Sequence, residues 1–92
     1  MPPSRTSFGE VWSRPGLPTR DRRLITLIIV TCHMQEAYVR LHLRAALENG
    51  EFTADELREI MLHLAYYAGW PVGTFGSAMV EEIVHQVAGG SE

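Results

Sequence analysis

A helix with well-marked ends occupies residues 53–68 of this sequence. It opens with a capping box, in which the side chains of Thr53 and Glu56 satisfy each other's free backbone N–H groups. Gly69 and then Pro71 follow its last turn, and these residues are typical of a helix end. A helix so clearly delimited indicates an α-helical chain.

Three further segments have helical spacing of their apolar residues. Residues 36–49 form one helix, closed by Gly50 at a position that favours left-handed backbone. A second begins at Thr19, as its N-cap, and runs to residues 31–34; its β-branched content would also suit a strand, but no hairpin signal follows. A third spans residues 74–87. The expected inward-facing residues are Leu24, Leu27, Ile28, Thr31, Val39, Leu43, Ala46, Leu47, Phe75, Met79, Ile83 and Val87.

These helices predict one all-α domain with a helical hairpin at its centre. We expect residues 1–7 to be a flexible leader, 8–88 to form the domain and 89–92 to be a flexible tail. Residues 8–18 contain two glycines and two prolines, which predict a turn-rich segment before the first helix.

Composition excludes several classes of function. The net charge of −3 argues against a nucleic-acid binder, because phosphate binding needs a dominant positive field. All eight basic residues are arginine, so Schiff-base chemistry and lysine-anchored pyridoxal phosphate are excluded. Cys32 is the single cysteine; it excludes an intramolecular disulfide and a Cys-x-x-Cys redox pair, and we expect it to be a small buried residue.

Size and hydropathy bear on where the protein acts and with what. A 92-residue chain buries roughly 60–65% of its unfolded surface, so self-association into a homo-oligomer is expected. The apolar run from Leu24 to Val30 is too short to span a bilayer, and the N-terminus has no apolar signal region. We therefore expect a cytoplasmic protein without a membrane partner.

His42 is the best candidate for proton transfer, because imidazole titrates near neutral pH. It shares a helix face with Tyr38 and Gln35, although a partly buried histidine bonded to a carbonyl would have the same spacing. Glu36 lies six residues from His42, about 240° around an ideal helix, so a joint role requires a frayed helix start or a site that straddles subunits.

Other polar residues have both a functional and a structural interpretation. Glu36, Arg40 and Arg44 recur at i, i+4 and i+8, as an anion site or as a solvated row of ion pairs. His63 and Tyr67 form an i, i+4 pair that lines a pocket or packs in the core. Metal ligation is not expected, since the His-Glu-x-x-His motif is absent and Glu82-Ile83-Val84-His85 is a lone Glu-x-x-His.

Several motifs together resemble the carboxymuconolactone decarboxylase family, in its γ-carboxymuconolactone decarboxylase branch. They are Gly9-Glu10-Val11-Trp12-Ser13-Arg14-Pro15-Gly16-Leu17, Arg22-Arg23-Leu24-Ile25-Thr26, Arg40-Leu41-His42-Leu43-Arg44-Ala45 and Tyr67-Ala68-Gly69. The distantly related alkylhydroperoxidase D-type proteins carry Cys-x-x-Cys three residues before a histidine that corresponds to His42. Gln35 and Tyr38 stand at those cysteine positions, so the resemblance excludes their redox chemistry.

The resemblance implies an all-helical homo-oligomer, a trimer or hexamer, and a cofactor-free decarboxylase. Its substrate would be 4-carboxymuconolactone, a small lactone carboxylate converted to 3-oxoadipate enol-lactone in protocatechuate catabolism, the β-ketoadipate pathway. The lactone carbonyl is the electron sink, so arginine must anchor a carboxylate and an acid must protonate a dienolate. The resemblance assigns His42 and Glu36 to catalysis and Trp12, Arg14, Arg22, Arg40, His63 and Tyr67 to substrate binding.

The sequence departs from the family pattern in three places. Family members usually have a helical segment before Gly-Glu-Val-Trp, residues 32–35 are bulkier than usual, and residues 72–75 replace small residues and Asn. These departures favour two alternatives, namely action on another lactone or β-keto acid, or a non-catalytic oligomeric helical binding protein.

Overall fold

The computed structural model describes the backbone of residues 5–89 and the side chains of residues 9–89. Most of the described chain is helical, and no strand occurs within it, which confirms the all-α prediction. The helices are α1 (Arg5–Ser13), α2 (Thr19–Cys32), α3 (Glu36–Glu48), α4 (Ala54–Ala68) and α5 (Trp70–Ala88). None of the described helices is long and apolar enough to cross a membrane.

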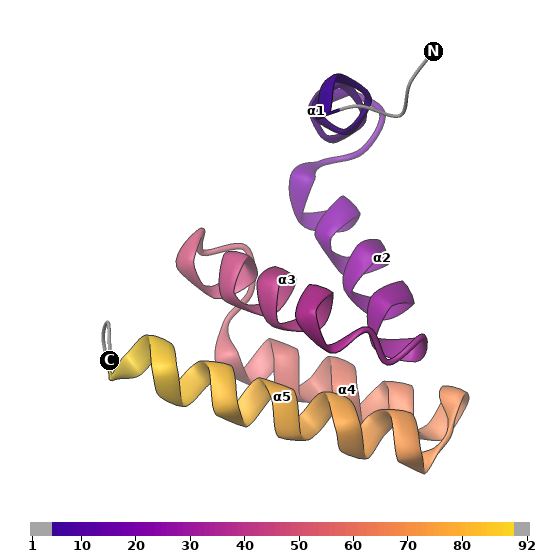
Figure 1. The fold of residues 1–92 in the computed structure, drawn as a ribbon, viewed down its shortest axis with the longest axis vertical. Coiled ribbons are helices and arrows are strands. Elements are labelled where there is room, and N and C mark those ends of the chain that lie inside the picture. Colours follow the sequence, from indigo (N-terminus) through magenta and orange to yellow (C-terminus); the bar gives the residue numbers. More distant parts are fainter. Residues whose placement is uncertain (1–4, 90–92) are drawn as a thin grey trace.

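The helical hairpin is formed by α4 and α5, which run side by side in opposite directions (Figure 1). Helix α3 packs on α5, and α2 packs mainly on α3. Helix α1 stands apart from this body and reaches it through α2 (Figure 1). The end of α1 and the first turns of α2 therefore lie together, away from the α4–α5 hairpin (Figure 1).

The core lies where α2, α3, α4 and α5 meet. Leu27, Leu43, Leu57 and Met61 are fully buried there, one or two from each of three helices, and α5 adds Ile83. Burial of apolar side chains stabilises the domain by about 1.5–3 kcal/mol for each one fully removed from water. The predicted inward-facing residues all lie in this core or against it.

The predicted capping box at Thr53 and the helix ends marked by Gly50 and Gly69 are confirmed. Thr53 accepts a hydrogen bond from the Glu56 backbone N–H, and the Glu56 carboxylate accepts one from the Thr53 N–H, at 3.1 and 2.9 Å. Gly50 and Gly69 have φ angles of 70° and 107°, a region that L side chains rarely adopt. Glycine at these two positions lets the chain turn between consecutive helices.

Replacing Thr53 with alanine is expected to destabilise the protein by about 1 kcal/mol, because one backbone N–H of α4 loses its partner. Thermal or denaturant unfolding measures the change. Thr74→Ala is the control, since Thr74 is exposed in the first half of α5 and caps nothing. Equal stability of the two variants would contradict a stabilising role for the capping box.

Two expected helix starts and one expected burial differ from the structure. α5 begins at Trp70 instead of residue 74, because Pro71 lies in its first turn, where a missing N–H costs nothing. Thr19 is the first residue of α2 and makes no side-chain cap; Pro18 occupies the N-cap with extended backbone. Cys32 is exposed at the end of α2 and is not a buried residue.

The segment before α2 also differs from its prediction. Residues 8–18, expected to be turn-rich, are helical up to Ser13, because both prolines come after that residue and a single helical glycine costs only about 1 kcal/mol. Of the leader predicted for 1–7, residues 5–7 belong to α1 and residues 1–4 lie outside the described chain. Of the predicted tail, residues 90–92 also lie outside it.

Candidate functional site

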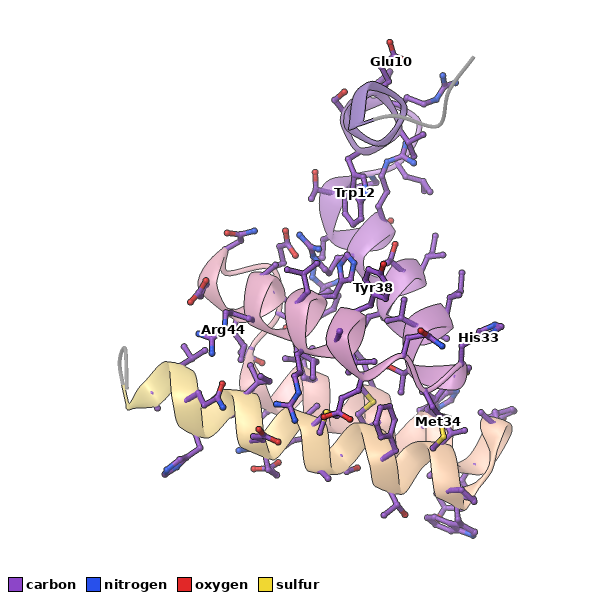
Figure 2. The ribbon with its side chains drawn as sticks, viewed as in Figure 1. Glu10, Trp12, His33, Met34, Tyr38 and Arg44 are labelled. Atoms are coloured by element: carbon purple, nitrogen blue, oxygen red, sulfur yellow. The ribbon has the colours of Figure 1, made fainter. Side chains whose placement is uncertain are left out.

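His42 lies at the centre of a polar cluster formed by α1, α2 and α3. The side chain of Trp12 points from α1 toward the body of the protein (Figure 2), and its ring lies 6.1 Å from the His42 ring, nearly parallel to it. Arg23 of α2 places its Nη1 atom 2.6 Å from Nδ1 of His42. His42 is half-buried.

Arg23 is fixed from two further sides. The Glu51 carboxylate accepts hydrogen bonds from its Nε and Nη2 atoms at 2.6 and 3.3 Å. Both side chains are only 11% exposed, so this is an ion pair largely removed from water. The guanidinium also lies 4.7 Å over the Trp12 ring, within range of a cation–π interaction. The cluster of Trp12, Arg23, His42 and Glu51 is therefore rigid.

The environment lowers the pKa of His42 below its ordinary value. Burial is the main cause, because it disfavours the charged ring, and the positive charge of Arg23 acts in the same direction. Glu51 acts against both, since its negative charge favours the imidazolium. At neutral pH the unliganded ring is consequently neutral.

Replacing Glu51 with glutamine is expected to lower the pKa of His42 further, because the one charge that favours the imidazolium is lost. Titration of the ring by NMR measures it. Glu56→Gln is the matched control, since the Glu56 carboxylate pairs with Arg20 on the exposed surface. A His42 pKa that rises in the Glu51 variant would contradict this electrostatic account.

A small hollow of about 160 Å³, lined by Trp12, lies between α1 and α2. Arg22 lines it and donates a hydrogen bond from Nη2 to the Arg14 carbonyl oxygen at 3.2 Å. Its Nε atom is buried and has no hydrogen-bond partner among the described residues. Of the predicted anion anchors, Arg22 is the one with donor capacity beside the His42 cluster; Arg14 contributes its backbone to that arrangement.

Arg40 and Glu36 lie on a different face of α3. Arg40 donates to Glu36 at 2.8 Å and also to Glu82 of α5, and these two carboxylates raise its pKa. Arg44 likewise reaches toward α5, where Gln86 accepts its hydrogen bond (Figure 2). No hydrogen bond joins Glu36 to His42 among the side chains described for residues 9–89. The row predicted at i, i+4 and i+8 thus pairs with its own helix and with α5.

His63 and Tyr67 lie away from this cluster. Their rings stack on each other with centroids 4.7 Å apart, and Tyr67 is 81% exposed. His63 lines a mainly apolar groove of about 430 Å³ between α2 and α4, with Glu59 and Arg20 also on its lining. No group of three or more potential metal ligands gathers among the described residues. The structure therefore joins Trp12 to His42 and leaves His63 and Tyr67 at a separate surface.

Sequence reasoning missed Arg23, which contacts His42, and Glu51, which holds Arg23. Arg23 stands beside Arg22 in a run of charged residues, and nothing in the spacing tells which of the two faces α3. Glu51 lies in the turn after α3, outside every helical pattern, and its partner is 28 residues away. The one available signal was the pair of adjacent arginines in the first turns of a helix that otherwise buries apolar residues.

Comparison with known proteins supplies the remaining information. The model of the carboxymuconolactone decarboxylase family matches residues 3–82. The chain is 46% identical over 80 residues to a 4-carboxymuconolactone decarboxylase from Acinetobacter baylyi, covering 87% of this chain and 59% of the relative. It is 42% identical over 65 residues to a nitrosuccinic acid decarboxylase from Metarhizium robertsii, covering 71% of this chain and 45% of that relative. No solved structure is significantly similar to the chain.

Proposed function

Because the chain belongs to the carboxymuconolactone decarboxylase family, we propose that it is a carboxy-lyase that converts 4-carboxymuconolactone to 3-oxoadipate enol-lactone without a cofactor. The observation that carries the proposal is the half-buried His42 held beside Trp12 and Arg23, in a chain 46% identical to a protein of that activity. The chain spans about three-fifths of that relative's length, so the relative's activity is a proposal for this chain.

The reaction makes few demands on the protein. The carbon–carbon bond to the departing carboxylate breaks, and its electron pair moves through the ring double bond into the lactone carbonyl, giving carbon dioxide and a dienolate. One proton then adds to carbon to give the enol-lactone. The protein must hold the spectator carboxylate, exclude water from the departing one and stabilise the dienolate oxygen.

The cluster offers groups for each of these tasks. We assign His42 to the dienolate, because it is the titratable group that Trp12 and Arg23 surround. Arg22 is the proposed anchor for the spectator carboxylate, since its buried Nε lacks a partner and guanidinium binds carboxylate in a bidentate way. Trp12, which stacks on His42 and lines the hollow with Arg22, is the proposed apolar wall that excludes water.

The other predicted site residues have weaker support from the geometry. Arg40 is committed to Glu36 and Glu82, and Glu36 could join His42 only in a site that straddles subunits. His63 and Tyr67 would require the same arrangement, because they line a separate surface of one chain.

We also propose that the protein acts as a cytoplasmic homo-oligomer. Large apolar side chains such as Tyr38, Leu41 and Tyr66 are more than half exposed, which is costly for a monomer. The exposed Cys32 thiol suits a reducing compartment. Light scattering after size-exclusion chromatography tests the assembly, and a monomer at micromolar concentration would refute it.

The test of the reaction is an ultraviolet assay of freshly generated 4-carboxymuconolactone, with carbon dioxide release measured in parallel. Loss of the lactone with stoichiometric carbon dioxide supports the proposed function. Nitrosuccinic acid is the second substrate, because a relative of 42% identity carries that activity in its name. Turnover of nitrosuccinic acid alone would show that the proposed substrate, 4-carboxymuconolactone, is wrong. Turnover of neither acid by the folded protein would refute the proposed function.

A further inference from the structure

The contact between Arg23 and His42 fixes the protonation state of the ring. A guanidinium is always protonated in proteins and has donors only, so Nη1 of Arg23 donates and Nδ1 of His42 accepts at 2.6 Å. An accepting Nδ1 carries no proton. The neutral ring must therefore bear its single proton on Nε2, which has no hydrogen-bond partner among the described side chains.

Arg23 is held too firmly to release Nδ1. Its Nε and Nη2 atoms donate to the Glu51 carboxylate, and this pair is largely buried. To form an imidazolium, Nδ1 would have to take up a proton against the Arg23 Nη1–H that points at it. That rearrangement would break the hydrogen bond and place two positive charges in contact.

We propose that Arg23, clamped by Glu51, is a positioning residue that keeps His42 neutral with its proton on Nε2. His42 then acts as a hydrogen-bond donor to the dienolate oxygen instead of as an imidazolium acid. This inference rests on the proposed decarboxylation. In that step the electron pair of the broken bond ends on the lactone oxygen, where the Nε2–H bond stabilises it. A water molecule then supplies the proton to carbon and leaves hydroxide.

This role differs from the proton-donor role expected from the sequence, in which His42 must carry two protons. The difference has a physical reason, since a neutral imidazole has a single N–H, and a ring that holds this proton in a hydrogen bond to the oxyanion does not pass it to carbon. Preorganised donors of this kind act through electrostatics and need no proton to move in the rate-determining step.

The pH dependence distinguishes the two roles. The charged groups that reach His42 are Arg23 from α2 and Glu51 from the turn after α3; α1 adds the uncharged Trp12, and the Glu82 carboxylate of α5 pairs with Arg40. A neutral donor requires the deprotonated ring, so kcat/KM should be constant at high pH and fall as pH drops through the His42 pKa, which lies below its ordinary value. A proton donor would lose activity in the opposite direction, as pH rises.

NMR of the unliganded wild-type protein tests the positioning directly. Long-range ¹H–¹⁵N spectra report which ring nitrogen is protonated, and the signals of His42 are identified by their loss in His42→Gln. We expect one tautomer at neutral pH, with a bare Nδ1 and a proton on Nε2. An imidazolium, or a mixture of tautomers, would overturn the proposal whether or not the protein is active.

Variants provide the second test. Arg23→Gln/Glu51→Gln removes both charges together, so no buried charge is left unpaired. We expect the pKa of His42 to rise and the single tautomer to be lost, because the effect of Arg23 on this pKa exceeds that of Glu51. An unchanged pKa and tautomer in the folded double variant would overturn the proposal, since a merely structural role would leave both unaffected.

His42→Gln separates the chemical roles, because glutamine keeps an N–H donor but cannot titrate. If His42 is a neutral donor, this variant should keep at least about a tenth of the wild-type kcat, a loss of roughly 1.4 kcal/mol or less. Activity as low as that of His42→Ala would overturn the neutral-donor role. Absence of turnover in the wild type, with the expected tautomer present, would instead refute the proposed function and leave the positioning by Arg23 intact.

Discussion

Replacing His42 with alanine is expected to lower kcat by about 10²–10³-fold, the usual cost of removing one donor to a developing oxyanion. The fold should persist, because the Arg23–Glu51 ion pair keeps both of its partners and no buried charge loses its counter-charge. The half-buried ring fills no part of the apolar core. The ultraviolet assay measures kcat, and circular dichroism measures the helix content.

His85→Ala is the matched control for this experiment. His85 is exposed near the C-terminal end of α5 and takes no part in the cluster around His42, so its loss should leave kcat unchanged. Comparison of the two variants separates the loss of one particular imidazole from a general effect of removing a histidine. Full turnover by His42→Ala would remove His42 from the mechanism.

The helices could be predicted wherever the sequence carries its own stop and start signals. These signals are local. The capping box joins Thr53 to Glu56, three residues away, and a glycine such as Gly50 or Gly69 sets only its own backbone angle. The start of α5 is harder to predict, because a proline that follows a helix end, such as Pro71, also favours the first turn of the next helix.

The candidate site was predictable only in part, because some of its residues are far apart in the sequence. His42 stands out chemically, and Trp12 stands out in the motif that contains it. Arg23 contacts His42 across 19 residues of sequence, and Glu51 contacts Arg23 across 28 residues. No spacing rule for a single helix reaches so far, whereas the i, i+4 pairing of Glu36 with Arg40 was foreseen because it is local.

The largest effect on stability is expected where α4 and α5 are in closest contact. Gly73 of α5 lies against Ala65 of α4, and both residues are buried. A Cβ atom at residue 73 would overlap the Ala65 Cβ and lie 2.6 Å from its Cα. These are atoms of a helix backbone and its first side-chain carbon, and no rotamer change can move them aside.

Gly73→Ala is therefore expected to destabilise the protein by about 3 kcal/mol, the upper part of the range for overpacked cores. For a domain of this size that is a fall in the melting temperature of roughly 12–24 °C, measurable by calorimetry. Gly9→Ala is the control, because a Cβ there would meet nothing within 4 Å, and alanine favours a helix interior by about 0.5–1 kcal/mol.

Gly76→Ala should cost less than Gly73→Ala, although a Cβ at residue 76 is also crowded. Its nearest neighbour is the Sδ atom of Met61, at the flexible end of a long side chain that can move, with the Thr31 methyl group at 3.1 Å. The double variant Ala65→Gly/Gly73→Ala returns the missing space and should be more stable than Gly73→Ala alone. If it is less stable than that single variant, the contact between these two residues is not what keeps α4 and α5 close.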